Sequence, residues 1–283
     1  MLQSLMKTRK SCFQSMPAFI NKGFGLVCTF LMVISFSNPV SARVRDDTRP
    51  FKVALVIGNN NYEDKPLINP IRDAREISNA LEESGFEVTL ANDLDSRSMV
   101  RTINRFIQES AKADVRIFYY AGHAFQYQDR NYLLPTDTIL SNELEAVLNH
   151  AISLDDFLIN EFARLRGANI LILDACRSNL RLATRGRGSS LGALAAITPP
   201  KGTLVAFSTR PGRFATDGPP GKHSPFTYSL LKHLDMPDIS AREMFDYVKE
   251  DVSTLTRNQQ IPWVDASHFQ GDFCFHSSRR GRC

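Results

Sequence analysis

Two apolar runs in this chain constrain its fold more than any other feature. Residues 115–122 and residues 169–174 are each long enough for a strand and consist mostly of apolar side chains. Near-continuous apolar runs of this kind are typical of strands that are buried on both faces of a parallel sheet. Such a sheet needs helices on both of its faces, so the two runs predict an α/β fold.

Each run is followed by a residue that can take part in catalysis. His123 ends the first run, and Cys176 follows the second, 53 positions later in the chain. In open α/β sheets the site lies outside the carboxyl ends of the strands, so we expect this thiol and this imidazole on one rim. An imidazole that takes the proton of a thiol turns a poor nucleophile into a good one. The pair therefore predicts a cysteine-nucleophile enzyme, although either residue alone would more often be structural.

Further strands alternate with helical patterns along the rest of the chain. We expect the other strands at 52–58, 87–92 and 203–208, and a last one near 263–267 or 273–275. Helices are expected over 71–81 with a stop at Gly85, over 99–107, over 154–166 with Ser153 as N-cap, from Pro225 to Leu234 after Ser224, and from Ser240 to about Leu255. This alternation predicts one domain built on a mostly parallel sheet.

The first 42 residues have the pattern of an export signal. They hold four basic residues and no acidic one, then an apolar stretch over 24–36, and the small residues Val40 and Ala42 suit cleavage after Ala42. The stretch is shorter than the roughly 20 apolar residues of a spanning helix, so we expect an exported protein, periplasmic or secreted, without stable membrane insertion once the signal is removed. Residues 43–50 would be a linker, 51–276 the domain and 277–283 a basic tail.

Removing this leader changes the charge balance. The whole chain has 34 Lys and Arg against 30 Asp and Glu, and the leader accounts for the entire excess. A chain of balanced charge gives little support to a nucleic-acid partner. Three cysteines remain after the leader, and two alternatives stay open: a Cys274–Cys283 disulfide beside a free Cys176, or unpaired cysteines in the tail.

Several short motifs, in the right order, resemble the caspase-like cysteine peptidases, the group of caspases, metacaspases and their bacterial relatives (peptidase family C14). The similarity runs from about Phe51 to Phe275 and includes Ala54-Leu-Val-Ile-Gly-Asn, Asn69-Pro-Ile-Arg-Asp-Ala, Tyr120-Ala-Gly-His, Asn131-Tyr-Leu-Leu-Pro, Asp174-Ala-Cys-Arg, Ser208-Thr-Arg-Pro-Gly and Ser224-Pro-Phe-Thr. The resemblance implies a three-layer sandwich with a central, mostly parallel six-stranded sheet. It also implies a cysteine endopeptidase that acts on proteins or peptides.

The resemblance assigns roles to the residues on the rim. Cys176 would attack the scissile carbonyl and His123 would protonate the leaving amine, with the backbone N–H groups of Cys176 and Ala124 as the oxyanion hole. The family usually has Gly where this chain has Ala124. If that position required a positive φ, the methyl group would cost about 1–2 kcal/mol and displace the donor. The alternative reading is therefore a catalytically impaired binding or scaffold protein, and a second is another amide hydrolase with the same dyad.

The same resemblance bears on the substrate. Asp174 stands where Asp-cutting caspases have Gln, and Asp217 aligns with a position of a pocket Arg. Two acids in the pocket repel a P1 carboxylate and pair with Arg or Lys, so the expected cleavage is after basic residues. Asp174 could instead cap a loop, and Asp73 could be a first-turn helix acid.

The Arg-, Gly- and Ser-rich stretch 181–190 lies where caspases carry their processing site. Arg181, Arg185 and Arg187 are therefore candidate autocleavage sites, with a solvated loop as the alternative. The remaining histidines lack metal-ligand spacing, so no metal site and no cofactor are expected. Some metacaspases use calcium, and the sequence leaves that requirement open.

Overall fold

The sheet that the apolar runs predict is the centre of the fold. The structure is a computed structural model that describes residues 50–140, 143–176, 194–271 and 273–278. Six strands form the main sheet in the order β2-β1-β3-β6-β7-β8, and all neighbours are parallel except β7 and β8. Their bounds are β1 Lys52–Gly58, β2 Glu87–Asn92, β3 Val115–Tyr127, β6 Ala168–Cys176, β7 Thr203–Phe207 and β8 Trp263–Asp265. This confirms the expected mostly parallel, six-stranded sheet.

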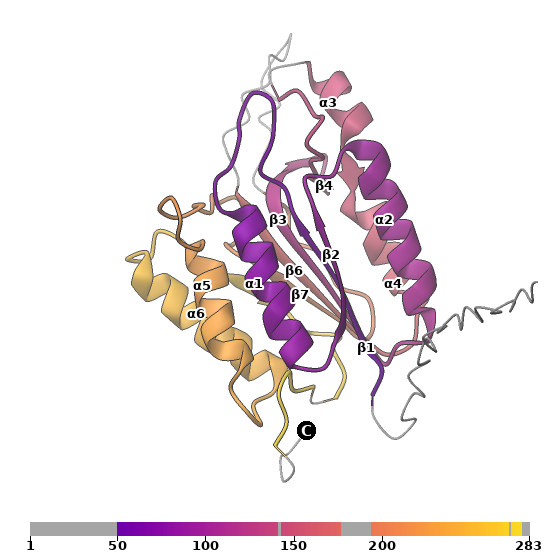
Figure 1. Ribbon diagram of the computed structural model, residues 1–283, viewed down its shortest axis with the longest axis vertical. Helices are drawn as coiled ribbons and strands as arrows, with labels where there is room; N and C mark the ends of the chain where they lie inside the picture. Colours follow the sequence, from indigo (N-terminus) through magenta and orange to yellow (C-terminus); the bar gives the residue numbers. More distant parts are fainter. Residues whose placement is uncertain (1–49, 141–142, 177–193, 272, 279–283) are drawn as a thin grey trace, which may run out of the picture. The chain divides into compact units, whose positions relative to one another are not determined.

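Helices cover both faces of the sheet (Figure 1). On one face lie α1 Pro70–Glu83, α5 Pro225–Leu234 and α6 Ala241–Leu255. On the other lie α2 Ser96–Glu109, a π-helical turn at Asp155–Ile159 and α4 Asn160–Phe162. Alternate residues of β1 serve the two cores: Ala54 and Val56 join the first, and Val53, Leu55 and Ile57 the second. Burial on both faces is why the strands are apolar throughout.

The expected capping residues begin their helices as predicted. The Ser224 hydroxyl accepts a hydrogen bond from the Thr227 N–H at the start of α5, and the Ser240 hydroxyl accepts one from the Glu243 N–H at the start of α6. Each cap satisfies a backbone donor that the first helical turn leaves without a partner. These two helices therefore begin where the sequence predicts, and the start of α5 brings Ser224 to the end of the sheet.

Two expectations about the elements differ from the structure. β3 does not stop at residue 122, where the apolar run ends, but continues to Tyr127 and pairs with β4 Arg130–Leu133 across a two-residue turn. Gln128 and Asp129 in that turn have φ of 49° and 60°, a conformation that Asn-Gly would have signalled and Gln-Asp does not. The last strand lies at Trp263–Asp265, which confirms the first of its two expected positions.

The second difference concerns the helix expected after Ser153. Ser153 belongs to the short strand β5 Ile152–Ser153, which pairs with β4, and only a π-turn and one turn of α-helix follow. The prediction of a regular helix over 154–166 was therefore wrong. The Ser153 hydroxyl still accepts from the Asp156 N–H at 3.2 Å, which is the capping contact that the sequence signals. The structure adds one helix that was not expected, α3 Leu144–His150.

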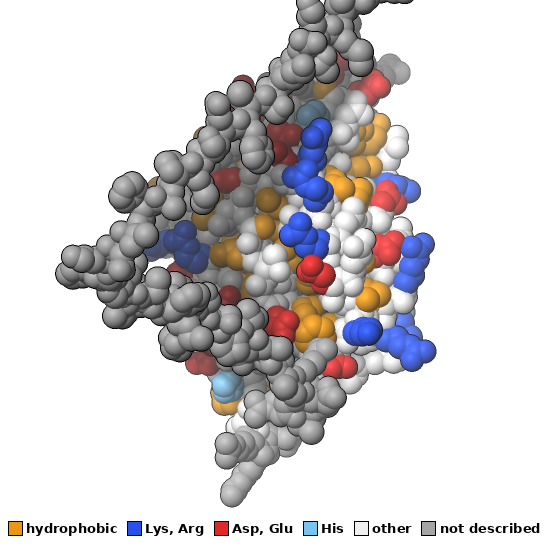
Figure 2. All heavy atoms as spheres, turned by 45° about the vertical axis from the view of Figure 1, so that its right-hand side comes forward, with side chains coloured by type: hydrophobic (Ala, Val, Ile, Leu, Met, Phe, Trp, Pro, Cys, Tyr) orange, Lys and Arg blue, Asp and Glu red, His pale blue; other side chains and the backbone are white. Residues whose placement is uncertain are grey.

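The surface and the C-terminal segment bear on the remaining predictions. Figure 2 shows Lys and Arg side chains interspersed with Asp and Glu on the face that includes α2. In the part of the chain that the structure describes, no helix is long and apolar enough to cross a membrane. Cys274 is disulfide-bonded, and its partner lies outside the described side chains. The expected leader, linker and Arg-rich loop also lie outside the described residues.

Candidate active site

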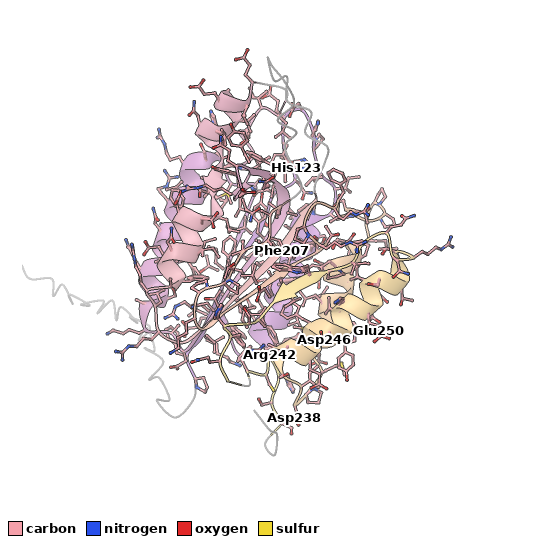
Figure 3. The ribbon with its side chains drawn as sticks, turned by 180° about the vertical axis from the view of Figure 1, so that it is seen from behind. His123, Phe207, Asp238, Arg242, Asp246 and Glu250 are labelled. Atoms are coloured by element: carbon pink, nitrogen blue, oxygen red, sulfur yellow. The ribbon has the colours of Figure 1, made fainter. Side chains whose placement is uncertain are left out.

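The rim at the carboxyl ends of the strands brings the two predicted catalytic residues to neighbouring positions. The strand order reverses between β1 and β3, which is where open α/β sheets place their ligand sites. The parallel pairing of β3 with β6 continues to its last pair, His123 with Cys176. Figure 3 shows His123 at this end of the sheet, beyond Phe207 at the end of β7. Adjacent parallel strands in register are about 4.8 Å apart, so the two backbones are close neighbours.

The imidazole of His123 is held in one orientation. His123 is 2% exposed, and its Nε2 lies 2.8 Å from the carbonyl oxygen of Lys65, in the segment that follows β1. A carbonyl can only accept, so Nε2 carries the hydrogen and Nδ1 is the basic nitrogen of the neutral ring. The ring of Tyr62 packs against the imidazole with centroids 4.4 Å apart. The structure thus selects the tautomer that a general base needs.

Two buried tyrosines also hold the backbone of His123. The His123 N–H donates to the Tyr62 hydroxyl at 3.0 Å, and the Tyr120 hydroxyl lies 2.8 Å from the His123 carbonyl oxygen. Both hydroxyls are also within 3.0 Å of the Leu134 carbonyl oxygen. Burial is the main reason that the pKa of Tyr120 is raised well above its ordinary value, so its hydroxyl stays a donor.

Gly122 makes this arrangement possible, and its replacement gives a first prediction. A Cβ at Gly122 would lie 2.6 Å from the Tyr120 hydroxyl and 2.7 Å from the Tyr62 hydroxyl. Gly122→Ala should therefore push both hydroxyls off the His123 backbone and lower kcat/KM by about 10²-fold, because misplacing a catalytic group by 1 Å costs that much. Steady-state kinetics with a peptide substrate measure the effect. Tyr62→Phe, which removes one of the two hydroxyls without a clash, should lose less, and an unchanged Gly122→Ala enzyme would contradict this role.

Ala124 has an ordinary strand conformation. It lies within β3, pairs with Leu133 of β4 and is 2% exposed. It is not among the non-glycine residues of the described chain whose φ is positive. The methyl group therefore adds no backbone strain at this position. The use of its N–H in an oxyanion hole stays a prediction.

Three carboxyl groups, two from helix or strand positions and one from a loop, lie close enough to interact electrostatically near the end of β6. Asp174 on β6 is 2% exposed and precedes Cys176 by two residues. Its Oδ2 accepts hydrogen bonds from the hydroxyls of Ser224 and Thr227, the latter at 2.7 Å. Its Oδ1 is buried and has no hydrogen-bond partner among the described residues. Asp174 thus presents one satisfied oxygen and a second that forms no hydrogen bond of ordinary geometry with the described residues, although the hydroxyl of Ser208 interacts with the carboxyl group and lowers its pKa.

The other two carboxylates are fixed by the start of α1. Oδ2 of Asp217, in the loop after β7, accepts from the backbone N–H groups of Ile68 and Asn69, at 2.9 and 3.3 Å. Asp73 in the first turn of α1 is 1% exposed, and its Oδ2 accepts from the Ser224 N–H at 3.2 Å. We call Asp73, Asp174 and Asp217 the acid cluster.

Two carboxyl groups of the cluster, those of Asp73 and Asp174, resist ionisation. Burial, and next the charge of Asp174, raise the pKa of Asp73 to about 9. Burial also raises the pKa of Asp174 to about 6, with the charge of Asp217 adding to it and the hydroxyls of Ser224 and Thr227 opposing it. Both directions follow from holding like charges together in a poorly solvated site. A cation placed among these groups would reverse the shift, so the cluster has the electrostatics of a cation site.

Sequence reasoning found part of this site and missed the rest. It placed His123, Cys176, Asp174 and Asp217 at one rim, and the structure brings the described members together there. It treated Asp73 as a helix first-turn acid, although its motif was recognised, and it did not identify the carbonyl of Lys65, which carries no side-chain signal. Arg181, Arg185 and Arg187 lie outside the described residues. Among the described residues no group of His, Cys, Asp and Glu has the arrangement of a metal site.

Known proteins are similar to this chain over part of its length. The chain is 29% identical over 127 residues to the human mucosa-associated lymphoid tissue lymphoma translocation protein 1, and 28% identical over 127 residues to its mouse homolog. Each match covers 44% of this chain and only 15% of the relative, so the chain spans a small part of these proteins. The model of the Peptidase_C14 family, described as the caspase domain, matches residues 51–274. That match covers most of the chain and includes both His123 and Cys176, and the chain therefore belongs to the caspase-domain family of cysteine peptidases.

Proposed function

We propose that this protein is a cysteine endopeptidase that cleaves peptide bonds after Arg or Lys with a Cys176–His123 dyad. The observation that carries the dyad is the register of the sheet, which pairs His123 of β3 with Cys176 of β6 at the ends of both strands. Membership of the caspase-domain family supports protein substrates.

The dyad chemistry follows from the orientation of His123. Nδ1, the basic nitrogen, takes the thiol proton of Cys176, and the thiolate attacks the scissile carbonyl carbon. The N–H groups of Ala124 and Cys176 would stabilise the resulting oxyanion. His123 then returns the proton to the amine as the C–N bond breaks, which leaves a thioester. Water attacks the thioester with His123 as base, releases the acid product and restores the thiol.

The acid cluster supports the preference for basic residues. Oδ1 of Asp174 is a buried acceptor without a partner among the described residues, and buried acceptors rarely stay in that condition. Asn69 adds a second buried acceptor of the same kind, its Oδ1. The guanidinium of a P1 Arg carries five donors in a planar fork, which suits several converging carboxyl oxygens. A P1 carboxylate would add a further negative charge to a poorly solvated site in which Asp73 and Asp174 already resist ionisation.

P1 profiling tests the proposal directly. Peptides that differ only at P1 should be cut with a kcat/KM at least about 10³-fold higher for Arg than for Asp, because a buried charge facing a like charge costs several kcal/mol. Citrulline, which has the shape of Arg without its charge, is the matched control substrate. Faster cleavage after Asp would overturn the assignment of the pocket. If a thiol-directed inhibitor with a basic P1 residue left Cys176 unlabelled, that result would favour a scaffold protein over a peptidase.

The leader and the Arg-rich loop extend the proposal. The basic and apolar pattern of residues 1–42 supports export and removal of the leader after Ala42, so that the peptidase acts outside the cytoplasm. A preference for basic P1 residues would also make Arg181, Arg185 and Arg187 substrates of the enzyme itself.

A further inference from the structure

The acid cluster has a titratable neighbour that the dyad chemistry does not use. Nδ1 of His223 lies 2.6 Å from Oδ1 of Asp73, and the two residues are 150 positions apart in the chain. The carboxylate of Asp73 is buried, whereas the ring of His223 is 21% exposed. His223 therefore closes one side of the cluster and still meets solvent.

The loop that carries His223 is fixed against α1. The Asn69 side-chain amide donates to the carbonyl oxygens of Asp217 and Pro219, at 2.6 and 3.1 Å. The guanidinium of Arg72 donates to the carbonyl oxygen of Gly221. Gly218, with φ of 81°, packs so closely on this loop that an added Cβ would lie 2.4 Å from the His223 carbonyl oxygen. The position of His223 beside Asp73 is thus built into the loop and is not the result of a flexible side chain.

The charges around His223 come mainly from α1. Asp73 contacts the ring directly, Arg72 opposes its protonation and Glu76 favours it. Lys222 precedes it in the loop. Beyond Asp73 lie Asp174 and Asp217, the other two members of the cluster. Among the residues that the structure describes, His223 is therefore the histidine whose ring lies between the acid cluster and solvent.

We propose that His223 is a specificity-determining residue whose imidazolium competes with the basic P1 side chain for Asp73, so that acid weakens the binding of basic substrates. The inference rests on the proposed basic P1 preference. At a separation of 2.6 Å one proton lies between Asp73 and His223, and an entering cation has to expel it. A second proton makes the ring an imidazolium, whose charge opposes the guest.

The expected pH range follows from the surroundings of the ring. Burial, and next Arg72, lower the pKa of His223 below its ordinary 6.5. The pair therefore takes up its second proton only below pH 6.5, and the competition is absent at pH 7.5. Protonation of the carboxyl groups also weakens binding on acidification, but that contribution remains when the imidazole is removed.

The test compares binding to full-length Cys176→Ala protein with and without His223→Asn. Asn keeps an amide that can hydrogen-bond to Asp73 and cannot be protonated in this range. Calorimetry with an acetylated peptide amide ending in Arg should give similar Kd values for both proteins at pH 7.5. At pH 5.0 the protein with His223 should bind the Arg peptide about 3- to 10-fold more weakly than the His223→Asn variant. Calorimetry in two buffers of different ionisation enthalpy should also show that the protein with His223 releases up to one more proton on binding than the variant does.

Matched controls separate the possible outcomes. The same peptide ending in citrulline should show no such difference, and His233→Asn should leave the pH dependence unchanged, because His233 pairs with Asp251 between α5 and α6. If the Kd for the Arg peptide changed with pH in the same way with and without His223→Asn, the role of His223 would be disproved and the preference for basic P1 residues would be unaffected. No preference for Arg over citrulline at pH 7.5 overturns both. Should His223→Asn not fold, NMR titration of the His223 ring in Cys176→Ala protein decides, since its pKa must fall when the Arg peptide binds.

Discussion

Replacing Cys176 by alanine is expected to abolish peptide hydrolysis, and replacing His123 by alanine is expected to lower kcat/KM by about 10³- to 10⁴-fold. His123 and Cys176 are paired in the register of β3 and β6, which places their backbones side by side at the ends of both strands. Without His123 the thiol keeps its proton near neutral pH and the leaving amine has no acid. Single-turnover and steady-state kinetics on an Arg peptide measure both effects.

The matched control for this pair lies between α5 and α6. His233 is also a buried histidine beside a carboxylate, since its Nε2 is 2.8 Å from Oδ2 of Asp251. His233→Ala should cost stability and leave kcat/KM of the folded enzyme within about 3-fold. Activity of the Cys176→Ala protein equal to that of the wild type would disprove the dyad. If the wild-type protein yields fragments that end at Arg181, Arg185 or Arg187 and the Cys176→Ala protein does not, the enzyme processes itself.

Replacing Asp174 by asparagine is expected to lower kcat/KM for Arg peptides by about 10²- to 10³-fold and to leave citrulline peptides within a few-fold. Asn retains one oxygen to accept from Ser224 and Thr227, but it puts an NH₂ group at one of the two oxygen positions and removes a buried charge from the cluster. Losing the partner of a buried charge costs about 3–5 kcal/mol. The ratio of the two substrates isolates this effect from any change in the dyad.

The same substitution should stabilise the folded protein at high pH. The pKa of Asp174 is raised to about 6 in the folded state from its ordinary 3.8, so the folded chain holds a proton that the unfolded chain releases between these values. Stability from this group is therefore present below pH 3.8 and is lost as pH rises through 6. Urea unfolding should give Asp174→Asn a free energy of unfolding higher by roughly 1–3 kcal/mol at pH 8, with the difference disappearing near pH 4.

A control separates this charge effect from a general effect of losing an acid. Asp251 pairs with Lys232 at 2.7 Å and with His233, and those partners lower its pKa. Because the pKa of Asp251 is lowered in the folded state, this group contributes stability at high pH that is lost as pH falls. Asp251→Asn should therefore lower the free energy of unfolding at pH 8. If Asp174→Asn lowered the free energy of unfolding equally at pH 8 and at pH 4, the ionised carboxyl group of Asp174 would not be a buried charge that destabilises the folded protein.

The sequence by itself determined the layers of the fold and the rim of the site. Apolar runs at 115–122 and 169–174 required a sheet covered on both faces, and Ser224 and Ser240 marked the starts of α5 and α6. These features depend on neighbours along the chain, through periodicity and capping, and can be recognised without knowing what packs against them. The common direction of parallel strands then placed His123 and Cys176 at one edge.

Only the tertiary structure decided how that rim is completed. Lys65 supplies a backbone carbonyl to His123, and Asp73 joins the acid cluster and contacts His223 from a position 150 residues before that histidine. The hairpin of β3 with β4 and the π-turn after β5 likewise depend on pairing between segments with weak local signals. Such contacts join residues that are distant in sequence, and a carbonyl or a first-turn acid looks the same in any helix or loop. Their roles arise only when packing removes water and places the groups within hydrogen-bond distance.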